Sequence, residues 1–75
     1  MSIKVTKYSR QGCTWCKKWD AEEKEYLRPC EFVEVEADHG LVPTFVVEVG
    51  EESKRFTGFT PASKLNEAIR ELANE

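Results

Sequence analysis

Two stretches of the chain, residues 3–8 and 31–36, alternate apolar and polar side chains with the two-residue period of a β-strand. Branched apolar side chains, which favour strands, recur in both. The mostly apolar run 45–49 predicts a third strand, and 54–57 predicts a short fourth one. Turn-forming residues from Gly50 to Ser53 separate the last two, so these strands are expected to form a hairpin.

Two further stretches have the spacing of helices. The first is expected to begin at or just after Cys13 and to run to about Leu27, because Pro29 disfavours helical geometry in the residue before it. The second has Thr60 as a suitable N-cap and Pro61 at the first helical position. A single apolar stripe follows along it: Leu65, Ala68, Ile69, Leu72 and Ala73.

The predicted order of elements is β-α-β-β-β-α, which places the chain in the α/β class. With 75 residues, the chain is expected to form a single domain over 1–75. The first β-α-β unit should be a right-handed parallel crossover.

Charge and hydropathy narrow the range of partners. A net charge of −3 argues against nucleic acid or a membrane surface held by a general positive field. No apolar run approaches the length of a membrane span, and the first residues begin a strand pattern rather than a signal sequence. We therefore expect a cytoplasmic protein. We also expect it to be a monomer. Three cysteines cannot pair completely, which in a reducing compartment favours reactive thiols or metal ligands over structural bridges.

Residues 12–16, Gly-Cys-Thr-Trp-Cys, lie between the first predicted strand and the first predicted helix. A Cys-x-x-Cys at such a junction is typical of dithiol redox sites. Cys13 would face unpaired N–H groups at the helix N-terminus, and nearby Arg10 and Lys17 add positive charge that favours the thiolate. Cys16 lies one turn further in, which suits a thiol that resolves a mixed disulfide.

Three motifs in this order resemble the thioredoxin/glutaredoxin superfamily. Residues 4–16 look like the start of a glutaredoxin, and Val42-Pro43-Thr44-Phe45 resembles the cis-proline step of the family. Residues 56–61, Phe-Thr-Gly-Phe-Thr-Pro, are similar to a stretch of the small glutaredoxin-like redoxins that supply electrons to ribonucleotide reductase. The resemblance covers nearly the whole chain.

The resemblance implies a minimal thioredoxin-like fold. It consists of a four-stranded mixed sheet with two helices on one face, and the family's usual middle helix is missing between the second and third strands. The other face should then be polar, because nothing covers it. The residues expected on this open face are Lys4, Thr6, Glu34, Glu36, Thr44 and Glu48.

The resemblance also implies roles for individual residues. Cys13 would be the nucleophile and Cys16 the resolving thiol. A cis Pro43 would bring the backbone of Val42 beside Cys13, where an extended substrate could pair with it. Substrate contacts are further expected from Arg10, Trp15, Gly58 and Phe59. At the position where thioredoxins carry a buried acid, this chain has Lys7, so it has no acid there.

The function so implied is a dithiol–disulfide oxidoreductase that reduces protein disulfides, with ribonucleotide reductase as a candidate partner. It needs no bound cofactor, and a reductase or glutathione would supply electrons. One alternative is a glutathione-dependent glutaredoxin. Another is a zinc module built from Cys13, Cys16, Cys30 and His39. We expect Cys30 to be a bystander rather than a third redox thiol. We expect His39 to be a solvated loop residue rather than one that tunes Cys13.

Overall fold

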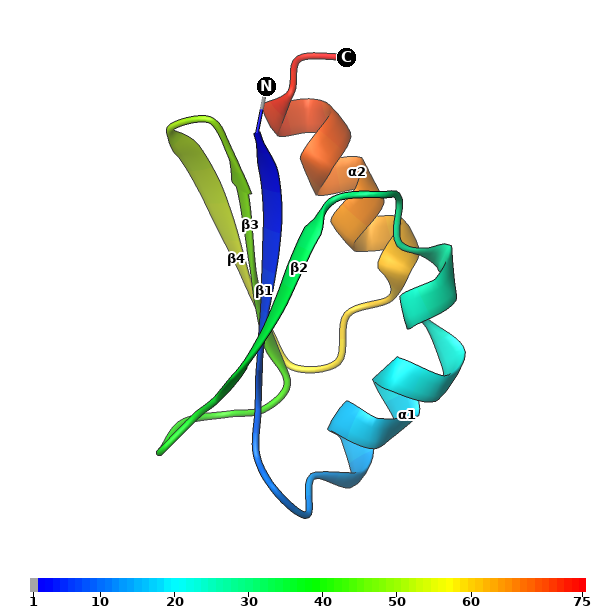
Figure 1. Cartoon of the computed structure of the whole chain (residues 1–75), viewed down its shortest axis with the longest axis vertical. Helices are drawn as coiled ribbons and strands as arrows, with labels where there is room; N and C mark the ends of the chain where they lie inside the picture. The colour runs from blue at the N-terminus through cyan, green and yellow to red at the C-terminus, as the bar shows by residue number, and fades with distance from the viewer. Residues whose placement is uncertain (1) are drawn as a thin grey trace.

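The computed structural model describes residues 2–75 and contains a mixed sheet with two helices (Figure 1). The order along the chain is that predicted, β-α-β-β-β-α. The elements are β1 (Ile3–Ser9), α1 (Thr14–Glu22), a single 3₁₀ turn (Lys24–Tyr26), β2 (Glu31–Glu36), β3 (Thr44–Val49), β4 (Glu52–Thr57) and α2 (Ala62–Leu72).

The four strands lie in the order β2-β1-β3-β4. β1 pairs with β2 in parallel and with β3 in antiparallel, and β3 and β4 form the expected hairpin. Both helices cover the same face of the sheet, and the short loop after β2 takes the place of a middle helix (Figure 1). The minimal thioredoxin-like architecture predicted from the sequence is therefore confirmed.

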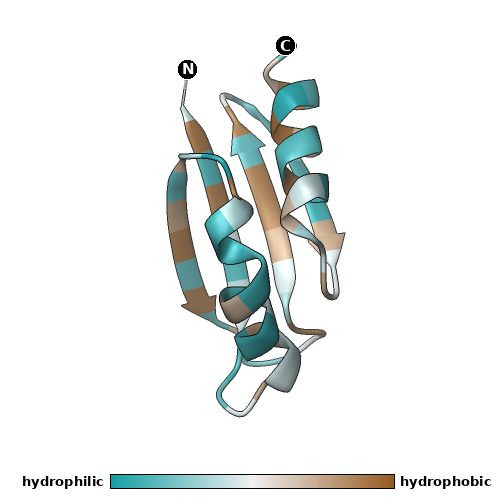
Figure 2. Ribbon diagram, turned by 90° about the vertical axis from the view of Figure 1, so that its right-hand side faces the viewer, coloured by the Kyte–Doolittle hydropathy of each residue, from teal (hydrophilic) through white to brown (hydrophobic). Residues whose placement is uncertain are grey.

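The core lies between the sheet and the helices. Trp19 of α1 is fully buried, stacks on Phe32 of β2 with ring centroids 5.8 Å apart, and contacts Phe45 of β3 at 4.9 Å. From α2, the predicted apolar stripe contributes Leu65, Ala68 and Ile69 to the same cluster. The view onto the helix-covered face shows the alternating apolar and polar bands of the strands behind the helices (Figure 2).

The prediction for the open face was wrong for two residues. The cross-strand rows of the sheet place Val33 and Val35 of β2 on the uncovered face, whereas Glu34 and Glu36 have the parity of the covered face. The reason is Phe32, whose ring fills the core against Trp19 and so fixes the parity of the whole strand. The open face is therefore partly apolar; its members include Tyr8, Val33, Val35 and Val46 along with Lys4, Thr6, Thr44 and Glu48.

Three predicted boundaries also differ. The first helix ends at Glu22 rather than near Leu27, and a 3₁₀ turn replaces its last part. The fourth strand begins at Glu52, two residues before the predicted start, because the turn tightens around Gly50, whose φ is +61°.

The N-terminus of α2 also differs, since Thr60 does not cap it. The Thr60 hydroxyl donates to the carbonyl of Gly58 at 3.1 Å. The backbone N–H of Ala62 donates instead to the carboxylate of Glu23 at 2.8 Å, so the cap comes from the end of α1. Glu23 is thus a structural residue that ties the two helices together.

Candidate active site

The two cysteines lie where β1 gives way to α1. Gly12 has a φ of +83°, which an L side chain rarely adopts, and the backbone N–H of Cys13 donates to the carbonyl of Arg10 at 3.1 Å. This tight turn makes Cys13 the N-cap of α1. Cys13 and Cys16 form a disulfide with their Cα atoms 5.2 Å apart, within the usual range for such bonds.

The two sulfurs have different surroundings. Cys13 is partly exposed, whereas Cys16 is only 4% exposed. The backbone N–H of Cys16 donates to Cys13 Sγ at 3.0 Å. In the reduced protein this donor and the positive end of α1 favour a thiolate at Cys13. Cys13 is therefore the sulfur that can be reached and ionised, and Cys16 the one held inside.

The Val42–Pro43 peptide bond is cis, as the sequence predicted. Val42 and Cys13 line one shallow groove of about 380 Å³, together with Arg10 and Trp15. The carbonyl of Pro43 accepts a hydrogen bond from the N–H of Gly58 at 2.8 Å. Gly58 has a φ of +92°, so a glycine is favoured at this close approach to the proline step.

An aromatic pair lies beside the groove. Trp15 is 56% exposed and meets Phe59 edge to face, with ring centroids 5.8 Å apart. The ammonium of Lys18 lies 5.0 Å from the centre of the Trp15 ring. Trp15 is thus exposed beside the site, whereas Trp19 belongs to the core.

Arg10 has a more structural setting than the sequence suggested. Its guanidinium donates to the carbonyl of Ala37 at 3.1 Å and to that of Gly40 at 2.9 Å. These bonds join the turn before Cys13 to the loop that replaces the middle helix. Arg10 still lines the groove with Cys13, so its charge remains near the sulfurs.

A charged cluster that the sequence analysis did not predict lies on the covered face. The Lys7 side chain has no exposed surface, and its Nζ lies 2.9 Å from Glu34 Oε2 and 3.1 Å from Asp20 Oδ1. The hydrogen bond from Lys7 holds the pKa of the Glu34 carboxyl below its usual value, and a second one from Ser9, at 2.9 Å, adds to this. The strand parity that turns Ile3 and Val5 inward does the same for Lys7, so the signal for a buried lysine was present in the sequence.

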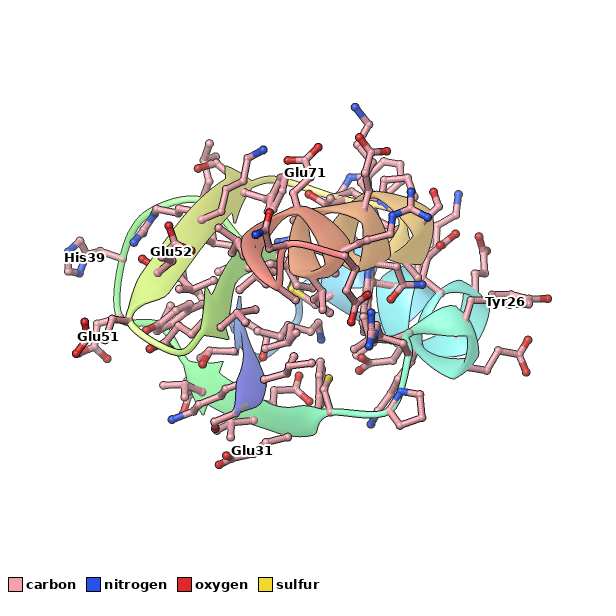
Figure 3. The ribbon with its side chains drawn as sticks, turned by 90° about the horizontal axis from the view of Figure 1, so that it is seen from above. Tyr26, Glu31, His39, Glu51, Glu52 and Glu71 are labelled. Carbon is pink, nitrogen blue, oxygen red and sulfur yellow. A yellow bond between two sulfur atoms is a disulfide. The ribbon has the colours of Figure 1, made fainter. Side chains whose placement is uncertain are left out.

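The four side chains of the zinc alternative do not come together. Cys30 packs at the edge of the apolar core, and burial raises the pKa of its thiol. His39 is exposed and points outward from the loop (Figure 3). It lines a pocket over the open face with Tyr8 and Arg55, and not the grooves that contain Cys13. Residues 2–75 hold no group of three or more His, Cys, Asp or Glu side chains placed to bind a metal ion.

Comparisons with known proteins relate the chain to others through its fold. No protein-family model and no curated protein sequence matches it. Among solved structures, it is similar to a malarial protein at 16% identity and a TM-score of 0.76, over 95% of this chain and 97% of that one. It is also similar to the reduced form of the periplasmic thioredoxin SoxS from Paracoccus pantotrophus at 17% identity and a TM-score of 0.70, over 97% of both chains.

The thioredoxin neighbour is a periplasmic protein, and the cytoplasmic location expected from the sequence stays a prediction. Among residues 2–75, no helix is both long enough and apolar enough to cross a membrane. The chain therefore has a thioredoxin-like fold that carries a paired Cys-x-x-Cys, Cys13 and Cys16, at its first strand-to-helix junction.

Proposed function

We propose that the protein is a thiol–disulfide oxidoreductase that reduces disulfides in other proteins. The observation that supports this most directly is that the two sulfurs have unequal surroundings. Cys13 is partly exposed at a helix N-terminus, and its Sγ accepts a hydrogen bond from the backbone N–H of Cys16. The Cys16 side chain is buried. Such an arrangement suits one sulfur for attack on a substrate and the other for release of the product.

In the proposed reaction, the Cys13 thiolate attacks one sulfur of the substrate disulfide. A mixed disulfide forms, and the other substrate sulfur leaves as a thiolate. Cys16 then loses its proton to solvent and attacks Cys13 Sγ, which forms the Cys13–Cys16 disulfide and releases the second substrate thiolate. An external donor of two electrons and two protons returns the pair to the dithiol.

The groove beside Cys13 supports a peptide as the substrate. Val42 lies in this groove next to the cis proline, where its backbone can pair with an extended chain. The exposed ring of Trp15 and the neighbouring Phe59 offer an apolar wall at one side. In this proposal Gly58 keeps the wall close to the proline step through its bond to Pro43.

The experiment is reduction of insulin disulfides with dithiothreitol as the electron donor. The wild type and Cys30→Ser should accelerate the reaction, and Cys13→Ser should abolish the acceleration. Pre-reduced Cys16→Ser, mixed with insulin in the absence of dithiothreitol, should instead accumulate a covalent adduct with the substrate, and later addition of dithiothreitol should cleave it. A wild type that accelerates nothing, or a Cys13→Ser variant as active as the wild type, would refute the proposal.

Two narrower parts of the proposal concern partners, and both rest on sequence resemblance. Ribonucleotide reductase is proposed as a substrate, and glutathione or a dedicated reductase as the donor. Replacing dithiothreitol with glutathione plus its reductase, or with thioredoxin reductase, identifies the donor that sustains turnover. Reduction of an oxidised ribonucleotide reductase in the same assay tests the substrate, and failure to reduce it removes this part alone.

A further inference from the structure

Among residues 2–75, Lys7 is the one charged residue whose side chain is buried. Burying an ammonium is unfavourable unless carboxylates compensate it, and an apolar residue of similar size would often be as stable. Asp20 and Glu34 provide this compensation, and the Trp19 ring lies 5.8 Å from Lys7 Nζ. We call Lys7, Asp20 and Glu34 the charge cluster.

The charge cluster lies beside the two sulfurs. Asp20 and Glu34 line the same pocket of about 350 Å³ as Cys13 and Cys16. Asp20 also follows Cys16 by four residues on α1, a spacing that puts two side chains on one face of a helix. With one ammonium and two carboxylates, the cluster presents a net charge of −1 to this pocket. The other charged groups that line the pocket are Arg10, Lys17 and Glu36.

We propose that the charge cluster sets the reduction potential of the Cys13–Cys16 pair, its net negative charge favouring the disulfide over the reduced form. This rests on the proposed function and identifies how that site is tuned. With glutathione as the partner, the disulfide and two glutathione molecules give a Cys13 thiolate, a Cys16 thiol, glutathione disulfide and one proton. The thiolate is the new negative charge, and the two carboxylates oppose it, which makes the reduced protein a stronger reductant.

The experiment measures the equilibrium with glutathione and the midpoint pH of thiolate formation at Cys13, followed by absorbance at 240 nm. Glu34→Gln and Asp20→Asn each remove a negative charge. Each should favour the reduced form about three- to tenfold, equivalent to about +15 to +30 mV, and should lower the midpoint pH. Lys7→Gln removes the positive charge and should shift both quantities in the opposite direction.

Glu31→Gln is the matched control, because Glu31 starts the same strand as Glu34 but pairs with Lys4, at the end of β1 away from the cysteines. Its side chain projects outward from the sheet (Figure 3). The substitution should leave both quantities unchanged. If Lys7→Gln fails to fold, the two carboxylate variants still decide the matter.

The inference fails if Glu34→Gln and Asp20→Asn keep the wild-type potential and midpoint pH, even if they are less stable, because the cluster would then serve folding alone. It also fails if they shift the potential downward. In either case wild-type reduction of insulin would still support the proposed function, so the two failures are distinguishable.

Discussion

The indole Nε1 of Trp19 donates a hydrogen bond of 2.7 Å to the backbone carbonyl of Thr60. Trp19 lies on the helix that begins at the cysteines, and Thr60 follows Gly58 and Phe59 beside the proline step. This one bond therefore joins α1 to the segment that forms the wall of the groove.

Replacing Trp19 by phenylalanine keeps an aromatic ring in the core but removes the donor. The carbonyl of Thr60, in a residue only 6% exposed, would lose its partner. We expect the free energy of unfolding to fall by about 1–3 kcal/mol, the cost of an unsatisfied buried polar group. Urea unfolding followed by far-UV circular dichroism measures the change. The exposed Trp15→Phe is the control, and equal midpoints for the two variants would contradict the prediction.

The carboxylate of Glu23 caps α2 from the end of α1. Glu23→Ala should therefore lower the free energy of unfolding by about 0.5–2 kcal/mol, the usual effect of losing a side-chain acceptor at a helix N-terminus. The neighbouring Glu22 is exposed and makes no such bond, so Glu22→Ala should change stability by no more than about 0.5 kcal/mol. Urea unfolding of the two variants side by side provides the test, and similar losses in both would show that the cap contributes nothing.

The contrast between these glutamates illustrates what the sequence could and could not predict. Local signals were enough for the strands, the stripe on α2 and the place of the cysteines, because each depends on spacing within a few residues. The cap from Glu23 to Ala62 spans 39 positions and depends on how two helices meet, which no local pattern encodes. A favourable local signal, Thr60 before Pro61, pointed instead to the wrong cap.

Strand parity was the second difficulty. In β2 the alternation was correctly predicted, but its direction was wrong, because Glu34 and Glu36 were expected on the open face. Packing decides the direction: Phe32 offers a flat ring to Trp19, and so Glu34 also turns inward. Glu34 can do this because Lys7, directly opposite on β1, supplies a compensating charge. Predicting the charge cluster therefore requires both facts at once: Lys7 faces the helices from β1, and Glu34 faces them from β2.

Protonation of Glu34 at acid pH should lower the free energy of unfolding of the wild type. The pKa of Glu34 is lowered in the folded protein, chiefly by the hydrogen bond from Lys7, whereas an unfolded glutamate has a pKa of about 4.3. The stabilisation is therefore fully present above that pH and is lost as the pH falls through the lower folded-state pKa. The wild type should lose more stability than Glu34→Gln between neutral pH and this acid range.

Urea unfolding at a series of pH values measures this difference. Glu31→Gln serves as the control, because Glu31 is exposed and lies on the same strand, and it should follow the wild type. A Glu34→Gln variant that loses stability in acid as steeply as the wild type would contradict the assignment.

Cys30 should behave as an unreactive thiol. Burial raises the pKa of its thiol, so at neutral pH it is largely protonated, and the thiol form is a poor nucleophile. After reduction, iodoacetamide should therefore label Cys13 well before Cys30, and Cys30→Ser should retain insulin reduction. Mass spectrometry of peptides at timed intervals gives the order, and labelling of Cys30 first would overturn it.

Trp15 provides the test of the apolar wall. More than half of its surface is exposed, and its edge-to-face contact with Phe59 holds the ring beside the groove that contains Cys13. Because the ring packs on little else, Trp15→Ala should keep the fold while it removes a contact to the substrate. An aromatic contact contributes about 0.5–1.5 kcal/mol, so kcat/KM for insulin should fall about two- to tenfold. The rate with a small linear disulfide such as 2-hydroxyethyl disulfide, which reaches only the sulfurs, should stay the same. An equal loss with both substrates would mean that Trp15 acts on the cysteines and not on the bound peptide.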